Sequence, residues 1–375
     1  MFDRSSLTRR SMLKALATVS GVALAPPAMS GLASALARRG APASADAVSL
    51  GDLAAQKGIL YGSSISKKHL SDDPDYAKLI AQQCKIVVPE SEMKWKALRP
   101  SPDKFAFQTA DWMVQWAEAH DLKVRGTALV WHEALPSWFS GYANQGNARD
   151  LLTNHIRTVM QHYAGKIQSW DVVNEGLTGS GLRETPWLRL IGPDYIDLAF
   201  RTAAEADPAA IRVYNDTNMA FAQNDAKRAQ VLKLLETMLS NNVPVQALGI
   251  ESHLRWDMGG FNPGKMRDFL KRVAGLGLQI FITEIDVRER DNDTDTNQRD
   301  KDIADYYYSY LSTVLQEDAV RMVISWGLTD RYSWLSGFAP RADGLPVRPL
   351  PFDQNLLPKA SFNAMAKAFE AASSR

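Results

Sequence analysis

The stretch Gln279-Ile280-Phe281-Ile282-Thr283-Glu284-Ile285-Asp286 joins an apolar, strand-like run to two carboxylates. Such an apolar run predicts a strand buried on both faces, as in a parallel sheet covered by helices. Glu284 stands at the end of the run, and in α/β barrels the carboxyl ends of the strands carry the catalytic side chains. The segment Ile167-Gln168-Ser169-Trp170-Asp171-Val172-Val173-Asn174-Glu175 has the same design. The sequence therefore predicts two buried strands that each end in a glutamate.

The same alternation of strand and helix patterns continues through most of the chain. We predict strands at residues 58–65, 86–89, 124–131, 167–175, 211–215, 247–250, 279–285 and 322–328. The helical patterns cover residues 74–83, 109–120, 151–163, 195–206, 226–240, 263–274, 298–315 and 360–372. Eight strands that are each followed by a helix predict a single α/β domain, a (β/α)₈ TIM barrel. A doubly wound open sheet has less support, because no glycine-rich phosphate loop follows the first strand.

The N-terminus predicts a targeting segment instead of folded structure. It carries the twin-arginine pattern Thr8-Arg9-Arg10-Ser11-Met12-Leu13-Lys14, then an apolar run over residues 15–28 and small-residue cleavage candidates at 35–37 and 43–45. That run is broken by two prolines and is too short to span a bilayer, although a basic tail or a membrane anchor is the alternative. We therefore expect residues 1–45 to be a twin-arginine signal peptide and leader, residues 46–375 to be the catalytic domain, and the mature protein to be periplasmic or secreted.

Composition limits the partners of the chain. Its net charge of +1 gives no sign of a nucleic-acid or membrane partner for the mature form. The single cysteine, Cys84, excludes an intramolecular disulfide, which suits a chain that folds in the reducing cytoplasm before export, and we expect it to be a buried thiol. The ten tryptophans belong either to the core or to surfaces that stack against sugar rings.

A barrel would gather many polar and aromatic side chains at the carboxyl ends of its strands. These are Glu90, Lys94, His132, Asn174, Glu175, Asp216, Glu251, His253, Glu284, Asp286, Trp326 and Trp334. We expect no metal, because the two histidines come from distant strands and Lys94 would repel a cation. Glycoside hydrolysis requires one carboxylic acid with a raised pKa and one ionised carboxylate, and strand-end glutamates provide such a pair. Asn174, next to Glu175, is suited to donate to a sugar 2-hydroxyl.

Five segments of the sequence resemble the motif set of glycoside hydrolase family 10, which consists mainly of retaining endo-1,4-β-xylanases. They are Pro89-Glu90-Ser91-Glu92-Met93-Lys94-Trp95, Arg125-Gly126-Thr127-Ala128-Leu129-Val130-Trp131-His132, Trp170-Asp171-Val172-Val173-Asn174-Glu175, Ile282-Thr283-Glu284-Ile285-Asp286 and Trp326-Gly327-Leu328-Thr329-Asp330-Arg331-Tyr332-Ser333-Trp334. The resemblance covers about residues 50–372.

The resemblance implies that Glu175 is the acid/base and Glu284 the nucleophile, with carboxyl groups about 5–5.5 Å apart in a retaining enzyme. It further implies that Asn174 holds the sugar 2-hydroxyl, that His253 hydrogen-bonds the nucleophile, and that Asp286 orients this network. The remaining implied substrate-binding residues are Glu90, Lys94, Trp131 and His132 on the non-reducing side, and Trp326 and Trp334 around the reactive sugar. It implies no cofactor and a polysaccharide partner, xylan or xylo-oligosaccharides. We expect a monomer.

Three positions depart from the family's usual pattern. Ser91 replaces an asparagine and Thr127 a histidine, which shortens two side chains near the cleavage point, and Glu251 replaces a glutamine. We hypothesise that Glu251 is either protonated or paired with a cation such as Arg255, and that it raises the acidic limb of the pH profile. The departures keep two alternatives open: a retaining hydrolase of another β-1,4-glycan or a decorated exopolysaccharide, and a catalytically silent carbohydrate-binding barrel.

Overall fold

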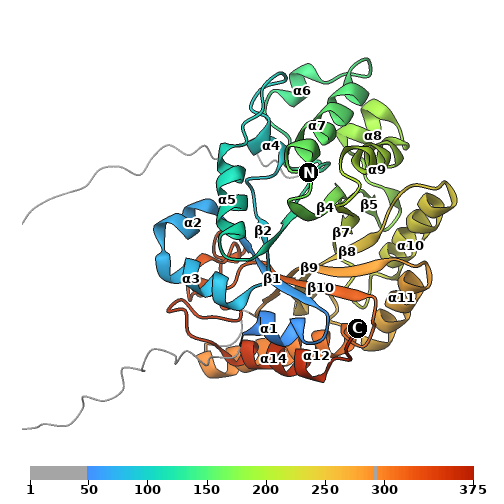
Figure 1. The fold of residues 1–375 in the computed structure, drawn as a ribbon. Coiled ribbons are helices and arrows are strands. Elements are labelled where there is room, and N and C mark those ends of the chain that lie inside the picture. The colour runs from blue at the N-terminus through green and yellow to red at the C-terminus, as the bar shows by residue number, and fades with distance from the viewer. Residues whose placement is uncertain (1–48, 291–293) are drawn as a thin grey trace, which may run out of the picture. The chain divides into compact units, whose positions relative to one another are not determined.

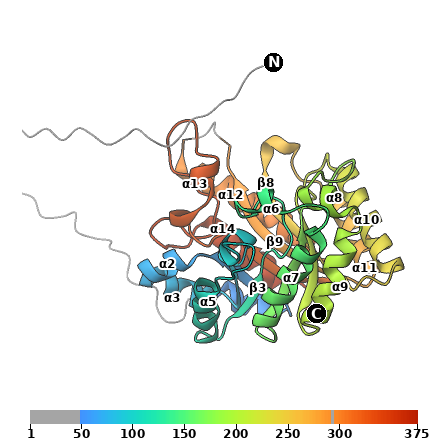
Figure 2. The same ribbon diagram turned by 90° about the horizontal axis from the view of Figure 1, so that it is seen from above.

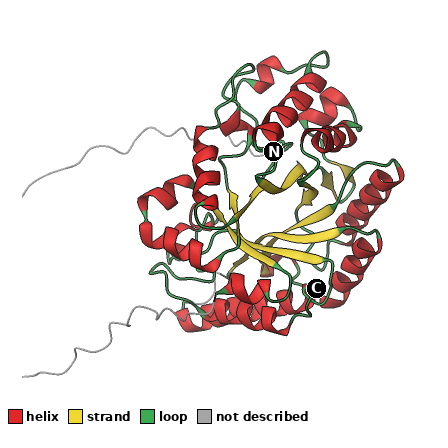
Figure 3. Cartoon of the chain, in the orientation of Figure 1, coloured by secondary structure: helices red, strands yellow, loops and turns green. Residues whose placement is uncertain are grey.

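The computed structural model describes residues 49–290 and 294–375, which belong to one compact unit. Eight parallel strands close into a barrel in the order β1-β2-β3-β4-β7-β8-β9-β10, and helices surround it (Figures 1 and 3). The strands are β1 (Leu60–Ile65), β2 (Ile86–Pro89), β3 (Lys123–Gly126), β4 (Ile167–Asn174), β7 (Ile211–Asp216), β8 (Ala247–Arg255), β9 (Gln279–Arg288) and β10 (Val320–Ser325). The predicted (β/α)₈ barrel is confirmed. The predicted leader lies outside the described residues.

Helix α1 precedes the first strand, and the other helices lie in the segments that follow the strands. The helices are α1 (Leu50–Ala55), α2 (Lys67–Asp72), α3 (Pro74–Gln83), α4 (Trp95–Leu98), α5 (Gln108–Glu118), α6 (Phe139–Tyr142), α7 (Ala148–His162), α8 (Pro186–Ile191), α9 (Tyr195–Ala206), α10 (Asp225–Ser240), α11 (Pro263–Gly275), α12 (Thr296–Val314), α13 (Leu335–Phe338) and α14 (Ala360–Ala371). Helices α2, α3 and α5 lie on one side of the barrel, and α9, α10 and α11 lie on the other (Figure 2). No described helix is long and apolar enough to cross a membrane.

Local sequence explains where several helices begin. Asp73 accepts a hydrogen bond from the Tyr76 amide and Pro74 follows it, which is a favoured N-terminal cap with proline in the first turn. Thr185 before Pro186 and Asn262 before Pro263 start α8 and α11 in the same way. The predicted bounds of α3 and α9 agree with the structure, whereas the other predicted helices differ at their ends by one to three residues.

Four strands end three or more residues from their predicted ends, and β10 is one of them, since it stops at Ser325 and leaves Trp326 beyond the strand. The β3 strand ends early, at Gly126, where an added Cβ would lie 2.2 Å from the Trp170 ring. Strands β8 and β9 extend further than predicted and pair with each other through Arg255 and Arg288. The extensions that the prediction missed are mostly polar, so an apolar pattern does not reveal them. Backbone pairing between β8 and β9 stabilises these residues as strand.

The tryptophans differ in burial and in place. Trp95, Trp170 and Trp187 are almost fully buried in the core. Trp326 is also buried, and Trp131 and Trp334 are half-buried, but these three accompany the predicted site residues. Cys84 is fully buried and its burial raises the pKa of the thiol, so the predicted buried cysteine is confirmed. A small two-stranded hairpin, β5 (Leu177–Thr178) and β6 (Gly181–Leu182), follows β4 and was not predicted.

Candidate active site

The β8–β9 register builds one half of the site. Glu251 lies opposite Glu284, and His253 lies opposite Asp286. The His253 Nε2 atom is 3.2 Å from Glu284 Oε2, and its Nδ1 atom is 3.0 Å from Asp286 Oδ2. Burial alone would lower the pKa of His253, but these two carboxylates raise it well above its usual value. Protonated on both nitrogens, His253 donates to both carboxylates and holds Glu284 in place. Trp334 Nε1 also donates to Asp286 Oδ2, at 2.7 Å.

Asn215, at the end of β7, lies between the two halves of the site. Its Nδ2 atom donates to Glu251 Oε1 at 3.0 Å and to Glu284 Oε1 at 3.4 Å. The Thr283 hydroxyl donates to Asn215 Oδ1 at 2.7 Å. The register pairs Asn215 with Asn174 of β4. The prediction missed Asn215, although its position at a strand end is the same signal that indicated Glu175.

Glu175 follows β4 in a left-handed backbone conformation, with φ of +52°. Such a conformation is uncommon for residues with a Cβ and needs support from its surroundings. The Glu175 amide donates to the Asn215 carbonyl at 2.9 Å, and Arg183 Nε donates to the Glu175 carbonyl at 2.9 Å. Arg183 stands directly after the β5–β6 hairpin, and its Nη2 atom lies 3.7 Å from Glu175 Oε2. The prediction missed Arg183 because it missed the hairpin.

The electrostatic surroundings of Glu175 favour its protonated form. Burial is the main cause of a pKa raised to about 7, and the nearby charge of Asp216 adds to it. Arg183 opposes this rise. Asp216 is itself paired with Lys227 Nζ at 2.6 Å, and it accepts a hydrogen bond from the Tyr214 hydroxyl at 2.6 Å. A carboxyl with a pKa near neutrality can release a proton and take one back, as an acid/base must.

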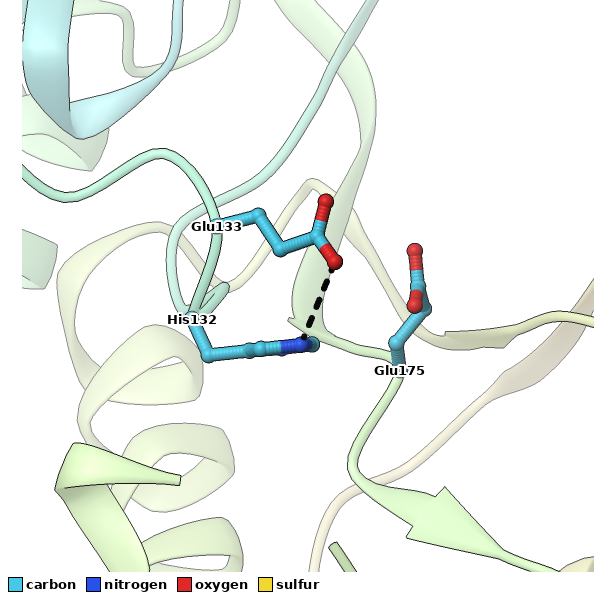
Figure 4. A group of neighbouring side chains, drawn as sticks. All are labelled: His132, Glu133 and Glu175. Carbon is cyan, nitrogen blue, oxygen red and sulfur yellow. Dashed lines mark ion pairs between the residues drawn. The ribbon is translucent and has the colours of Figure 1, made fainter. Parts of the chain in front are cut away.

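His132 and Glu133 approach Glu175 from the segment after β3. Figure 4 shows the three side chains converging from two parts of the chain. His132 Nε2 lies 3.6 Å from Glu133 Oε1, and one polar atom from each of the three residues lies within 4.8 Å of the others. Burial, with Arg183, lowers the pKa of His132, which therefore favours the neutral imidazole. Glu133, which the prediction did not include, is exposed and contributes to the raised pKa of Glu175.

Lys94 and two tryptophans form a third part of the site. Lys94 Nζ lies 4.6 Å from the centre of the Trp131 ring and 5.9 Å from that of Trp326. The Trp326 ring lies edge-on to His253, with 6.3 Å between ring centres. Glu90 follows β2, and burial raises its pKa against the opposing charge of Lys94. The structure thus brings these sequence-predicted residues toward the two glutamates.

The three departures have different surroundings. Ser91 is exposed. Thr127 is buried beside Asp171, whose raised pKa it lowers, and Asp171 pairs with Arg125 inside the barrel. Glu251 is buried. Arg255 binds Asp257 through both Nε, at 2.6 Å, and Nη2. The alternative in which Arg255 neutralises Glu251 is therefore wrong.

Two groups of side chains within the described residues have the composition of metal ligands: His132 with Glu133 and Glu175, and Glu251 with His253 and Glu284. In the second group both ring nitrogens of His253 already bind carboxylates. In the first, Arg183 places a fixed positive charge beside Glu175. Both groups overlap the glutamate pair, and their contacts favour proton transfer and nucleophilic attack.

Comparison with known proteins agrees with this geometry. The model of the family described as "Glycosyl hydrolase family 10" matches residues 49–368. The endo-1,4-beta-xylanase B of Thermotoga neapolitana is 35% identical over 303 residues, which cover 80% of this chain and 85% of that protein. The crystal structure of xylanase 10B from Thermotoga maritima is 36% identical, with a TM-score of 0.80, and covers 86% of this chain and 98% of that one.

A second solved structure, xylanase 10B from Thermotoga petrophila RKU-1 in complex with xylobiose, is 34% identical with a TM-score of 0.81. The match covers 86% of this chain and 97% of that one. Fold, motif order and similarity along the described barrel all agree. The chain belongs to glycosyl hydrolase family 10.

Proposed function

We propose that this protein cleaves internal β-1,4-xylosidic linkages of xylan with retention of the anomeric configuration. The observation that carries this proposal is the unequal treatment of two glutamates at one end of the barrel. Glu284 accepts hydrogen bonds from Asn215 and from His253, whose other ring nitrogen bonds Asp286, and this arrangement suits a nucleophile. Glu175 has a pKa raised to about 7 and so retains a proton for the leaving group. The names of the relatives, and the xylobiose bound in one of them, support xylan as the substrate.

The proposed mechanism is a double displacement. Glu284 attacks the anomeric carbon while Glu175 gives its proton to the departing glycosidic oxygen, which leaves a covalent glycosyl-enzyme. Glu175, now a carboxylate, takes a proton from water, and that water attacks the same carbon. The bond to Glu284 breaks, the product leaves with its original configuration, and Glu175 is protonated again.

The neighbouring side chains support this cycle. In the proposal, His253 positions Glu284, and Asp286 and Trp334 orient His253. Asn174 donates to the 2-hydroxyl of the attacked sugar. Trp326 and Trp334 contact the reactive sugar, while Lys94, Glu90, Trp131 and His132 line the non-reducing side.

The first experiment measures reducing-sugar release from xylan, cellulose and mannan by residues 46–375, with Glu284→Gln beside the unaltered protein. We expect release from xylan, a mixture of oligosaccharides, and β-anomers as the first products in a proton NMR time course. A first product with the α-configuration contradicts the retaining mechanism. Full activity in Glu284→Gln contradicts the assignment of the nucleophile.

A second candidate substrate class is another β-1,4-glycan or a decorated exopolysaccharide. The observation that favours it is Ser91, a short exposed side chain at a position where the family usually carries asparagine. Higher kcat/KM on cellulose or mannan than on xylan would support this class. A catalytically silent, carbohydrate-binding barrel would bind xylo-oligosaccharides but release nothing from an aryl xylobioside at any pH.

We also propose that the protein is exported by the twin-arginine route and acts as a monomer in the periplasm or outside the cell. The support is the pattern at Arg9 and Arg10, followed by an apolar run and small-residue cleavage candidates. Replacing both arginines by lysine should retain the protein in the cytoplasm, as measured by fractionation. Export of that variant at the normal level would contradict the route, and light scattering of the mature chain tests the monomer.

A further inference from the structure

Glu251 places a third carboxyl group beside the two glutamates that the proposed function uses. It is 6% exposed, and one of its oxygens lies within 4.8 Å of polar atoms of both His253 and Glu284. The charged groups that act on it are Glu284 from β9, Glu175 directly after β4, His253 from its own strand, and Asp216 from β7. An ionised Glu251 would thus meet three carboxylates and one imidazolium.

The orientation of Asn215 determines which atoms around Glu251 can donate. Asn215 Oδ1 accepts from the Thr283 hydroxyl, and Asn215 Nδ2 faces Glu251 Oε1 and Glu284 Oε1. Turning this amide around would set its oxygen against two carboxyl oxygens. Asn215 Nδ2 therefore faces the glutamates, and the Asn174 atom that lies 2.8 Å from it must be an acceptor, Oδ1.

That same atom of Asn174 lies 3.0 Å from Glu251 Oε1. If both were unprotonated oxygens, two acceptors would face each other at hydrogen-bond distance. Turning Asn174 around would remove this conflict but would set its nitrogen 2.8 Å from Asn215 Nδ2, donor against donor. A proton on Glu251 gives the contacts of this Asn174 atom with Glu251 Oε1 and Asn215 Nδ2 a donor and an acceptor each, because a carboxylic acid can do both. The third neighbour of the atom, the Asn215 backbone carbonyl oxygen, lies farther away, at 3.3 Å, and already accepts from the Glu175 amide.

We propose that Glu251 works as a neutral carboxylic acid that donates from Oε1 to Asn174 Oδ1. This bond fixes the Asn174 amide with its Nδ2 available to the sugar 2-hydroxyl, so Glu251 is a positioning residue for Asn174. The inference rests on the proposed function, in which Asn174 holds that hydroxyl.

Two further observations agree with a neutral Glu251. Burial and the charges of Glu284 and Glu175 raise the pKa of Glu251 well above its usual value. The glutamine that the family usually carries at this position is also a neutral donor, so a protonated Glu251 reproduces its charge and its hydrogen bond. Since a neutral group adds no charge beside Glu284, the expected pH effect moves from the acidic limb to the basic limb. There, rising pH removes the proton and with it the bond to Asn174.

A pair of substitutions separates the donor from the charge. Glu251→Gln keeps a donor, and we expect kcat at pH 5 within about threefold of the unaltered enzyme; Glu251→Leu removes the donor, and we expect a fall of about 10- to 100-fold. In an Asn174→Ala background, Glu251→Leu should lower kcat further by less than about threefold, because both changes remove the same interaction. Equal losses in the Gln and Leu variants, or fully additive losses in the double variant, would overturn the inference.

The pH profile gives the second measurement, on a dinitrophenyl xylobioside whose leaving group needs no proton. On this substrate the protonation of Glu175 does not limit glycosylation, so a remaining basic limb in kcat/KM reports another group. We expect such a limb in the unaltered enzyme and its displacement to higher pH in Glu251→Gln, where His253 is the remaining group whose proton supports Glu284. An unchanged limb in that variant overturns the inference. A failure of the proposed function itself would be recognised separately, because the Glu284→Gln variant would then remain active.

Discussion

Glu284 and Glu175 are held in different ways. Glu284 lies inside β9, and its hydrogen-bond partners also belong to strands: His253 to the adjacent strand β8 and Asn215 to β7, one strand further along. Glu175 lies just beyond a strand, and Arg183 from a connecting segment binds its carbonyl oxygen. Burial and Asp216 of β7 are the main causes of its raised pKa, while Arg183 lowers that pKa and Glu133 raises it. The barrel therefore fixes where the nucleophile stands and sets most of the acid's pKa, whereas the loops make the finer adjustment.

The largest expected effect is on the strand side. Glu284→Gln removes the attacking carboxylate, so we expect kcat on xylan to fall about 10⁴-fold or more. The thermal midpoint should change little, because the amide occupies the same volume. Glu205→Gln, an exposed ion-pair residue of α9, is the matched control and should keep full activity. Activity of Glu284→Gln within tenfold of normal would contradict the comparison.

Glu175→Gln should show a loss that depends on the leaving group. On xylan we expect a fall of about 10²- to 10⁴-fold, because the departing oxygen receives no proton. On a dinitrophenyl xylobioside, glycosylation should stay fast and the glycosyl-enzyme should accumulate, since no base activates water. Stopped-flow kinetics would record a burst of dinitrophenolate. Equal losses on both substrates would exclude Glu175 as the acid.

Arg183→Met tests the loop side through the basic limb of kcat/KM on xylan. Arg183 lowers the pKa of Glu175, so removing its charge should raise that pKa and move the limb to higher pH, by about one unit. Arg183→Lys keeps the charge and should move the limb less, while losing the bond to the Glu175 carbonyl. A limb that stays in place in Arg183→Met would mean that the arginine only supports the backbone.

The smallest effect should come from Glu133→Gln, with the opposite sign. Glu133 raises the pKa of Glu175, so its removal should move the basic limb down by a few tenths of a unit. Because 62% of the Glu133 side chain is exposed, the shift should shrink at about 1 M salt. Asp305→Asn, an exposed change on α12, controls for general charge effects. A shift that stays the same at high salt would contradict the interpretation that Glu133 acts through an exposed charge that ions screen.

The parts of the fold that were predictable are those that an apolar period reveals. Glu175 and Glu284 were found because each ends an apolar run. The patterns placed α3 and α9 to the residue, and α3 also has a capping Asp73 followed by proline. The polar end of β8, which carries Glu251 and His253, was not recognised as strand. Ladder pairing with β9 extends it, and pairing partners leave no mark in a single sequence.

The site residues that the sequence did not reveal are those whose roles depend on their neighbours in space. Asn215 becomes important through its register with Asn174, and register follows from barrel closure. Arg183 and Glu133 depend on the paths of two connecting segments, one of which forms a hairpin of two-residue strands too short for any pattern. The pairing of Arg255 with Asp257, and not with Glu251, likewise could be recognised only from the three-dimensional structure.

The buried, solitary Cys84 has a practical consequence. With its thiol enclosed and its pKa raised, it is a poor target for maleimide dyes or thiol-reactive supports. One cysteine introduced at an exposed position, such as Asp305, would then be the single reactive handle on the described barrel. A fluorescent label on that cysteine could report how the enzyme binds a polysaccharide chain. The same thiol could be used for oriented immobilisation, and neither use requires removal of a native thiol first.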